Sequence, residues 1–193
     1  MNRFRNKSIV DAGANVGIFS IYAASQCPNA QIFSLEPFPS TFSLLCSNLD
    51  RNNLQPRVRP FQLGLSSTSG ASAMSAEPTS TYRRIAEAQS DDGDSFESVN
   101  VINLQEFLDQ QGIQTIDFFK MDIEGSEWPV ILSSSPDLWH RVRNFQVEDH
   151  EVNVKYGYHP QMLLDHLGRG GHTVVEHVED EFHTGLILTK LTA

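Results

Sequence analysis

The stretch Val10–Ser20 reads VDAGANVGIFS, and it predicts the start of an α/β fold. The apolar residues 8–10 predict a short strand that ends at Asp11, a turn with two glycines follows, and the apolar-rich residues 18–24 predict a helix. Strand, glycine turn and helix in this order build a nucleotide site at the carboxyl end of the first strand of a doubly wound sheet. We therefore expect the rest of the chain to form a sheet that faces this turn.

The turn itself suggests which ligand it binds. Gly13 and Gly17 can adopt backbone angles closed to other residues and let a ligand approach the main chain. A dinucleotide fingerprint has glycine where this chain has Asn15, which argues against a pyrophosphate on the turn. The carboxylate of Asp11 would also repel phosphate, but it suits the ammonium and sulfonium groups of S-adenosylmethionine. The residues of this turn, Asn15 included, are predicted to bind that cofactor.

A second acidic residue follows the next predicted strand, residues 30–35. Glu36 lies about 20 residues beyond the glycine turn, which is the distance typical of an acid that accepts hydrogen bonds from ribose hydroxyls. The alternative is that Asp11 and Glu36 bind no ligand and are only hydrated residues at the ends of their strands, on the rim of the sheet. Phe38 either packs against adenine or holds the start of the next helix, and the sequence does not separate these two roles.

Composition limits the class of protein. The 193 residues are 39% hydrophobic and 20% charged, which fits one folded domain over residues 1–193. The net charge of −10 argues against nucleic acid as a bulk partner. Cys27 and Cys46 show no disulfide or metal spacing, no signal-peptide pattern follows the basic start, and no apolar run approaches membrane-spanning length. We expect a cytoplasmic protein with no membrane partner.

The middle and the end of the chain complete the pattern of alternating strands and helices. Residues 66–98 are rich in small and polar residues, and we expect an irregular insertion that forms part of the substrate wall. Asn103 followed by Glu106 predicts a capped helix start. The remaining expected elements are a helix from Ser40, strands at 58–65 and 99–102, and an antiparallel terminal pair at 173–175 and 184–189.

A second group of polar residues follows two further predicted strands. Residues 116–122 predict a strand that ends at Asp122, with Glu124 in the next turn, and residues 144–150 predict a strand that ends at His150. Because the carboxyl ends of neighbouring parallel strands meet at one edge of a sheet, we expect these three side chains to face the glycine turn.

Three separated motifs together resemble the FkbM family of S-adenosylmethionine-dependent methyltransferases: VDAGANVG (10–17), FSLEPFPSTF (33–42) and IDFFKMDIEGSEW (116–128). The resemblance implies the Rossmann-like class I methyltransferase fold, a mostly parallel seven-stranded sheet with an antiparallel last strand and helices on both faces. It also implies transfer of a methyl group to a hydroxyl of a sugar, polyketide or other natural product. The family's usual N-terminal segment has no counterpart before residue 8, so we expect a site partly open to solvent or to a partner.

Methyl transfer to an alcohol needs a group that takes the hydroxyl proton. Asp122 is our first candidate beside the transferred methyl, either in the chemistry or in cofactor contact. His150 has the better intrinsic pKa for a base, and Glu124 is placed to orient the acceptor. Lys120 is interpreted as an ion-pair partner of Asp122 or a neighbouring carboxylate, or as a substrate contact. We expect no required metal, because no histidine or acid spacing fits one.

Three functions remain open from the sequence. The first is a small-molecule O-methyltransferase, the second a catalytically silent adenosyl-binding or scaffold protein, and the third a nicotinamide-dependent oxidoreductase, which Asn15 and Asp11 disfavour. The sequence does not identify the hydroxylated acceptor, distinguish oxygen from nitrogen methylation, or give the oligomeric state.

Overall fold

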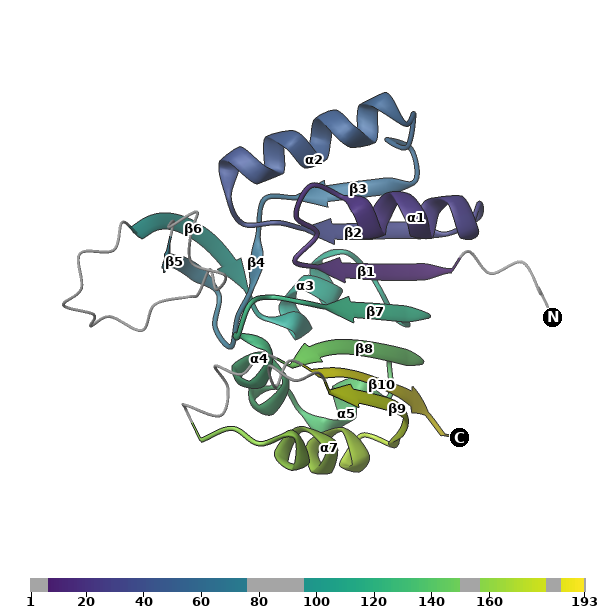
Figure 1. The fold of residues 1–193 in the computed structure, drawn as a ribbon, viewed down its shortest axis with the longest axis vertical. Helices are drawn as coiled ribbons and strands as arrows, with labels where there is room; N and C mark the ends of the chain where they lie inside the picture. The colour runs from purple at the N-terminus through teal and green to yellow at the C-terminus, as the bar shows by residue number, and fades with distance from the viewer. Residues whose placement is uncertain (1–6, 76–95, 150–156, 180–184, 193) are drawn as a thin grey trace.

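The structure is a computed structural model that describes residues 7–75, 96–149, 157–179 and 185–192 (Figure 1). In this part of the chain the main sheet has seven strands in the order β3-β2-β1-β7-β8-β10-β9. The last strand, β10, lies between β8 and β9 and runs antiparallel to both, whereas the other pairs are parallel. The expected class I fold is therefore confirmed. The strands are β1 (Ser8–Ala12), β2 (Gln31–Leu35), β3 (Val58–Phe61), β7 (Phe118–Met121), β8 (Asn144–Asp149), β9 (His172–Glu179) and β10 (Gly185–Leu191).

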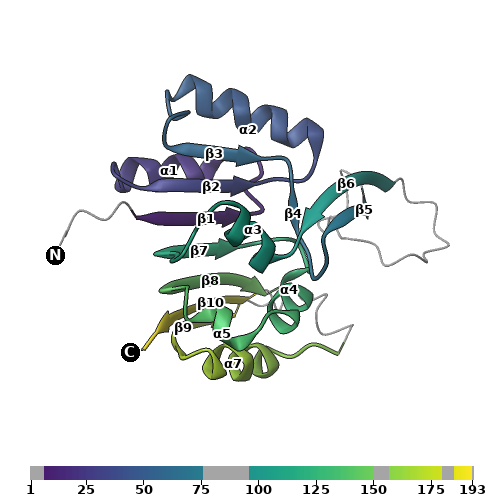
Figure 2. The ribbon, with the colours of Figure 1, turned by 180° about the vertical axis from the view of Figure 1, so that it is seen from behind.

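Helices cover both faces of this sheet (Figures 1 and 2). The strand pleat explains the two layers, because Ile9 of β1 packs with one set of helices and Val10 with the other. On the Ile9 face lie α1 (Ile18–Gln26) and α2 (Pro39–Arg51). On the Val10 face lie α3 (Leu104–Gln110), α4 (Glu127–Ser133), α5 (Pro136–Trp139) and α7 (Pro160–Arg169).

A second, three-stranded sheet stands beside the carboxyl ends of the main strands (Figure 1). It consists of β4 (Gly64–Leu65), β6 (Phe96–Ile102) and β5 (Gly70–Ser75), with β6 in the middle. The single strand expected at 58–65 is thus divided. Its first half is the edge strand β3, which tolerates Pro60, and its second half turns away to pair with β6.

The range 66–98, expected to be irregular, is regular at both ends. Residues 70–75 and 96–98 belong to the antiparallel pair β5 and β6, and residues 76–95 lie outside the described part of the chain. The predicted cap of α3 is present, since the backbone N–H of Glu106 donates to Asn103 Oδ1 over 2.9 Å. The hydroxyl of Ser69 adds to this cap: it accepts from the Asn103 N–H at 3.0 Å and donates to the Glu106 carboxylate.

None of the described helices combines the length and the apolar character needed to cross a bilayer.

Candidate functional site

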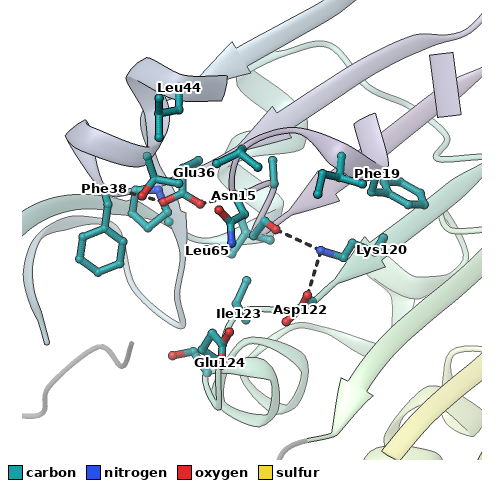
Figure 3. Close-up of a pocket in the computed structure, with 18 residues that line it drawn as sticks. Asn15, Phe19, Glu36, Phe38, Leu44, Leu65, Lys120, Asp122, Ile123 and Glu124 are labelled. Carbon is teal, nitrogen blue, oxygen red and sulfur yellow. Dashed lines mark hydrogen bonds and ion pairs between the residues drawn. The ribbon is translucent and has the colours of Figure 1, made fainter. Parts of the chain in front are cut away.

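A cavity of about 550 Å³ lies at the carboxyl ends of β1, β2 and β7 (Figure 3). Its walls come from four places in the chain: the glycine turn and the start of α1, the β2–α2 connection, β4 of the small sheet, and β7 with the turn that follows it. The cavity therefore lies where the candidate site is expected from the sequence. The lining residues used below are Gly13, Asn15, Glu36, Phe38, Leu65, Lys120, Asp122 and Glu124.

The glycine turn is held against β2 by the main chain. The backbone N–H groups of Gly13 and Ala14 both donate to the carbonyl oxygen of Leu35, at 3.1 and 2.9 Å. Gly13 (φ 76°) and Asn15 (φ 50°) adopt left-handed angles, for which glycine and asparagine are suited. Gly17 lies away from the cavity wall, and a Cβ on it would come within 2.7 Å of Leu45 Cδ1, so its small size serves the packing of α1 on α2.

Glu36 holds the second wall of the cavity. Its Oε2 accepts from the backbone N–H of Asn15 at 3.0 Å, and its Oε1 accepts from the N–H of Phe38 at 3.1 Å. These bonds connect the glycine turn to the start of α2 through one carboxylate. The residue is only 5% exposed, and it is one of the residues that line the cavity.

Phe38 contacts the small sheet and also lines the cavity. The ring packs with Val99 and Val101 of β6, so it joins the small sheet to the start of α2. The same residue lines the cavity together with Leu65 of β4 (Figure 3). An apolar wall of this kind suits a flat ring, and the contact with adenine stays a prediction.

Asp11 has a different position from the expected one. The first strand continues to Ala12, so Asp11 lies inside β1, in register with Ser34 of β2 and Lys120 of β7. It is fully buried, does not line the cavity, and accepts a 2.6 Å hydrogen bond from the Ser20 hydroxyl. Burial raises the pKa of Asp11 above its ordinary value, and the Lys120 ammonium and the Ser20 hydroxyl oppose that shift. Its contact with a bound cation stays a prediction.

Lys120 is an ion-pair partner, which was one of the two interpretations of this residue. Its ammonium lies 3.2 Å from Asp122 Oδ2 and 3.5 Å from Asp11 Oδ1. It also donates to the carbonyl oxygen of Gly13 at 3.0 Å, a contact that the sequence analysis did not foresee (Figure 3). The strand register accounts for the ion pairs, because Asp11 of β1 is paired with Lys120 of β7 and Asp122 follows Lys120 by two residues, which returns it to the same side.

The turn after β7 brings two of the three candidate catalytic residues to the cavity. Asp122 and Glu124 both line it, and the side chain of Asp122 is 28% exposed. Glu124 has a φ of 57°, a left-handed angle that is rare for glutamate. Residues with such strained backbone angles are found often at functional sites. The turn is braced by the buried carboxylate of Glu127, which accepts from the Ile123 N–H at 2.8 Å.

The third candidate, His150, lies outside the described residues. Within residues 7–75, 96–149, 157–179 and 185–192, no group of three acidic, histidine or cysteine side chains is arranged to hold a metal ion. The expectation of a metal-independent reaction stays a prediction.

Comparison with known proteins gives the family. The model of the methyltransferase FkbM domain matches residues 11–174. Methyltransferase sdnD of Sordaria araneosa is 31% identical over 84% of this chain and 73% of its own length. The 31-O-demethyl-FK506 methyltransferase FkbM of Streptomyces tacrolimicus is 26% identical over 96% of this chain and 79% of its own length.

The fold is also found among solved structures. The precorrin-6y C5,15-methyltransferase of Geobacter metallireducens superimposes with a TM-score of 0.56 at 15% identity, over 99% of this chain and 83% of its own. TrmK of M. capricolum, solved with S-adenosylhomocysteine, gives 0.56 at 12% identity, over 96% and 62%. At these identities the likeness concerns the fold alone. The family match over residues 11–174 decides the assignment: this chain belongs to the FkbM methyltransferase family.

Proposed function

We propose that the cavity binds S-adenosylmethionine and that the enzyme transfers its methyl group to a hydroxyl oxygen of a small molecule. The observation that carries the proposal is the carboxylate of Glu36, fixed by the N–H groups of Asn15 and Phe38 on the wall of a cavity that also contains Asp122. The names of two relatives, the 31-O-demethyl-FK506 methyltransferase and a hexuronic acid methyltransferase of Haloferax volcanii, support a small-molecule acceptor.

The residues present fit this cofactor. A volume of about 550 Å³ lies within the usual range for small-molecule sites, roughly 300 to 1,000 Å³. Glu36 supplies an acceptor-only group that suits a vicinal diol, and Phe38 and Leu65 supply an apolar wall that suits adenine. The bound cofactor would supply a methyl carbon that its sulfonium already activates for in-line displacement.

The chain's own residues then have two tasks, alignment and proton transfer. The glycine turn and Glu36 hold the cofactor from β1 and β2, while Asp122 and Glu124 approach from the end of β7. Alignment of the reacting atoms is the main source of rate in such a displacement. Asp122, with His150 as the other candidate base, would take the proton of the acceptor hydroxyl, while the methyl group would pass to the hydroxyl oxygen by cleavage of the carbon–sulfur bond and S-adenosylhomocysteine would leave.

Both described cysteines are free, which supports the proposal of a reducing, cytoplasmic compartment.

Calorimetry followed by an acceptor screen tests the function. We expect S-adenosylhomocysteine to bind and NAD not to bind. We then expect labelled methyl from S-adenosylmethionine to enter one or more members of a panel of hydroxylated sugars and polyketides, each read by a mass increase of one methyl group. Binding without any transfer would instead support the silent adenosyl-binding protein, and failure to bind S-adenosylhomocysteine would refute the proposal.

A further inference from the structure

Lys120 is the only positively charged residue among the described residues that line the cavity. It lies in β7 between Phe119 and Met121, which point to the opposite face and are fully buried. Its side chain is only 13% exposed. Withdrawing an ammonium from water costs several kcal/mol unless partners replace the lost hydration. This position is therefore maintained by specific contacts.

Two of those contacts come from segments that line the cavity. The carbonyl oxygen of Gly13 belongs to the glycine turn, and Asp122 belongs to the segment after β7 that lies against this turn. The third partner, Asp11, lies beneath them in β1. The Gly13 carbonyl accepts a hydrogen bond from the ammonium, and the carboxylates of Asp122 and Asp11 lie at ion-pair distances of 3.2 and 3.5 Å.

Only one of the three partners needs the charge for its own stability. Asp11 is fully buried, whereas the side chain of Asp122 is 28% exposed to solvent and the Gly13 carbonyl is neutral. An ion pair that served Asp11 alone would not require the contacts at 3.0 and 3.2 Å to the turn and to Asp122. The Gly13 turn and the Asp122 segment also meet along the main chain, and these two contacts add a side-chain tie between them.

We propose that Lys120 is a positioning residue that ties the Gly13 turn to Asp122 and so sets the shape of the cofactor site. The proposal rests on the proposed function, because it assumes that the cavity takes an adenosyl cofactor. It assigns Lys120 no contact with the reacting atoms. Its effect on the ligand passes through the carbonyl oxygen of Gly13 and the carboxylate of Asp122.

Lys120→Met and the double variant Asp11→Asn/Lys120→Met separate positioning from stability. The single variant leaves the Asp11 carboxylate buried without its cation, so we expect a lower melting temperature. The double variant replaces a buried ion pair by two neutral side chains of similar volume, which is tolerated in other proteins, so we expect much of the melting temperature to return. We expect S-adenosylhomocysteine to bind both variants about tenfold or more weakly than the wild type, as measured by calorimetry well below their melting temperatures.

Arg143→Met is the matched control. It breaks the 2.7 Å ion pair with Asp117, which precedes β7 at the other end from the cavity, and it should leave the affinity unchanged. The proposal would be overturned if the folded double variant bound S-adenosylhomocysteine within threefold of the wild-type affinity. Failure of both variants to fold would also overturn it, because Lys120 would then serve stability alone. Failure of the wild-type protein to bind S-adenosylhomocysteine would refute the proposed function instead.

Discussion

The backbone carbonyl oxygen of Asp122 lies so close to Gly13 that a Cβ on this glycine would be 1.7 Å from it. The two segments are also joined directly, because the Asp122 N–H donates to the carbonyl oxygen of Ala12 at 3.1 Å. The glycine turn and the rim that bears Asp122 are thus in contact along the main chain. The absence of a side chain at position 13 is what permits this approach.

Gly13→Ala should destabilise the protein far more than Gly112→Ala. Both glycines have left-handed φ angles, 76° and 67°, but a Cβ on Gly112 would meet no atom within 4 Å. We expect a loss of about 1 kcal/mol at Gly112 from backbone strain alone, and a loss of about 3 kcal/mol or more at Gly13 from strain and overlap together. Urea unfolding measures both values. Equal losses would show that the contact with Asp122 relaxes at no cost.

Glu36→Gln should weaken the binding of S-adenosylhomocysteine. A charged acceptor contributes about 1.5 to 3 kcal/mol per hydrogen bond, so the dissociation constant should rise about tenfold to a hundredfold. The amide keeps the size of the side chain, but its oxygen replaces only one of the two acceptors, so one of the hydrogen bonds from Asn15 and Phe38 is lost as well. Glu106→Gln, in the cap of α3, is the control and should bind like the wild type. A change of less than threefold in Glu36→Gln would remove the residue from the cofactor site.

Asp122→Asn should lower turnover more than cofactor affinity. Loss of a proton acceptor costs about 10² to 10⁴ in rate, whereas the amide preserves the shape of the rim. Turnover is followed with labelled methyl and the acceptor found in the screen, and affinity by calorimetry with S-adenosylhomocysteine. Asp137→Asn, on the exposed side of α5, provides a control that should change neither value. An unchanged rate in Asp122→Asn would leave His150 as the remaining candidate base.

Stability should fall as the pH drops below the ordinary histidine pKa of 6.5. His172 is buried, its Nε2–H donates to the Trp139 carbonyl at 3.0 Å, and its Nδ1 lies 2.9 Å from the Thr189 hydroxyl oxygen. Burial lowers the pKa of His172. The pKa of His166 is also lowered, mainly by burial and to a smaller extent by the positive charge of Arg169. Below pH 6.5 the unfolded chain takes up protons that the folded chain does not, so the free energy of unfolding decreases until the lowered pKa values are reached.

His172→Gln tests the sign and the source of this dependence. At about pH 7.5 the free energy of unfolding of the variant should be about 1 kcal/mol lower, because the variant loses one of the hydrogen bonds of His172. Between about pH 7.5 and 5.5 its free energy of unfolding should change less than that of the wild type. Urea unfolding at a series of pH values gives the comparison, with the exposed His177→Gln as control. A slope equal to that of the wild type would contradict the assignment to His172.

The architecture and the position of the cavity could be predicted from the sequence because both depend on local patterns. The glycine turn after β1, the acid after β2 and the acidic turn after β7 each follow an apolar strand, and parallel strands bring their carboxyl ends together. What the sequence could not show depends on exact strand lengths and on contacts between distant segments. One further residue in β1 places Asp11 in the interior instead of at the strand end.

The small sheet illustrates the same limit. Leu65 follows the edge strand in sequence without a clear break, and only its pairing with Ile102 shows that β4 belongs to another sheet. The contact from Lys120 to the Gly13 carbonyl likewise joins residues 107 positions apart, a separation beyond any local pattern.

The ladder between β5 and β6 has a consequence for how this enzyme can be altered. At one end of this ladder Ser75 pairs with Phe96. At the other end Gly70 pairs with Val101, which also pairs with Gly64 of β4 in the cavity wall. The chain departs from the ladder at residue 75 and rejoins it at residue 96, so the two ends of the intervening piece are fixed as neighbours. A segment of other length or composition that is grafted between residues 75 and 96 would therefore start and end on neighbouring strands, and the β5–β6 ladder would be preserved.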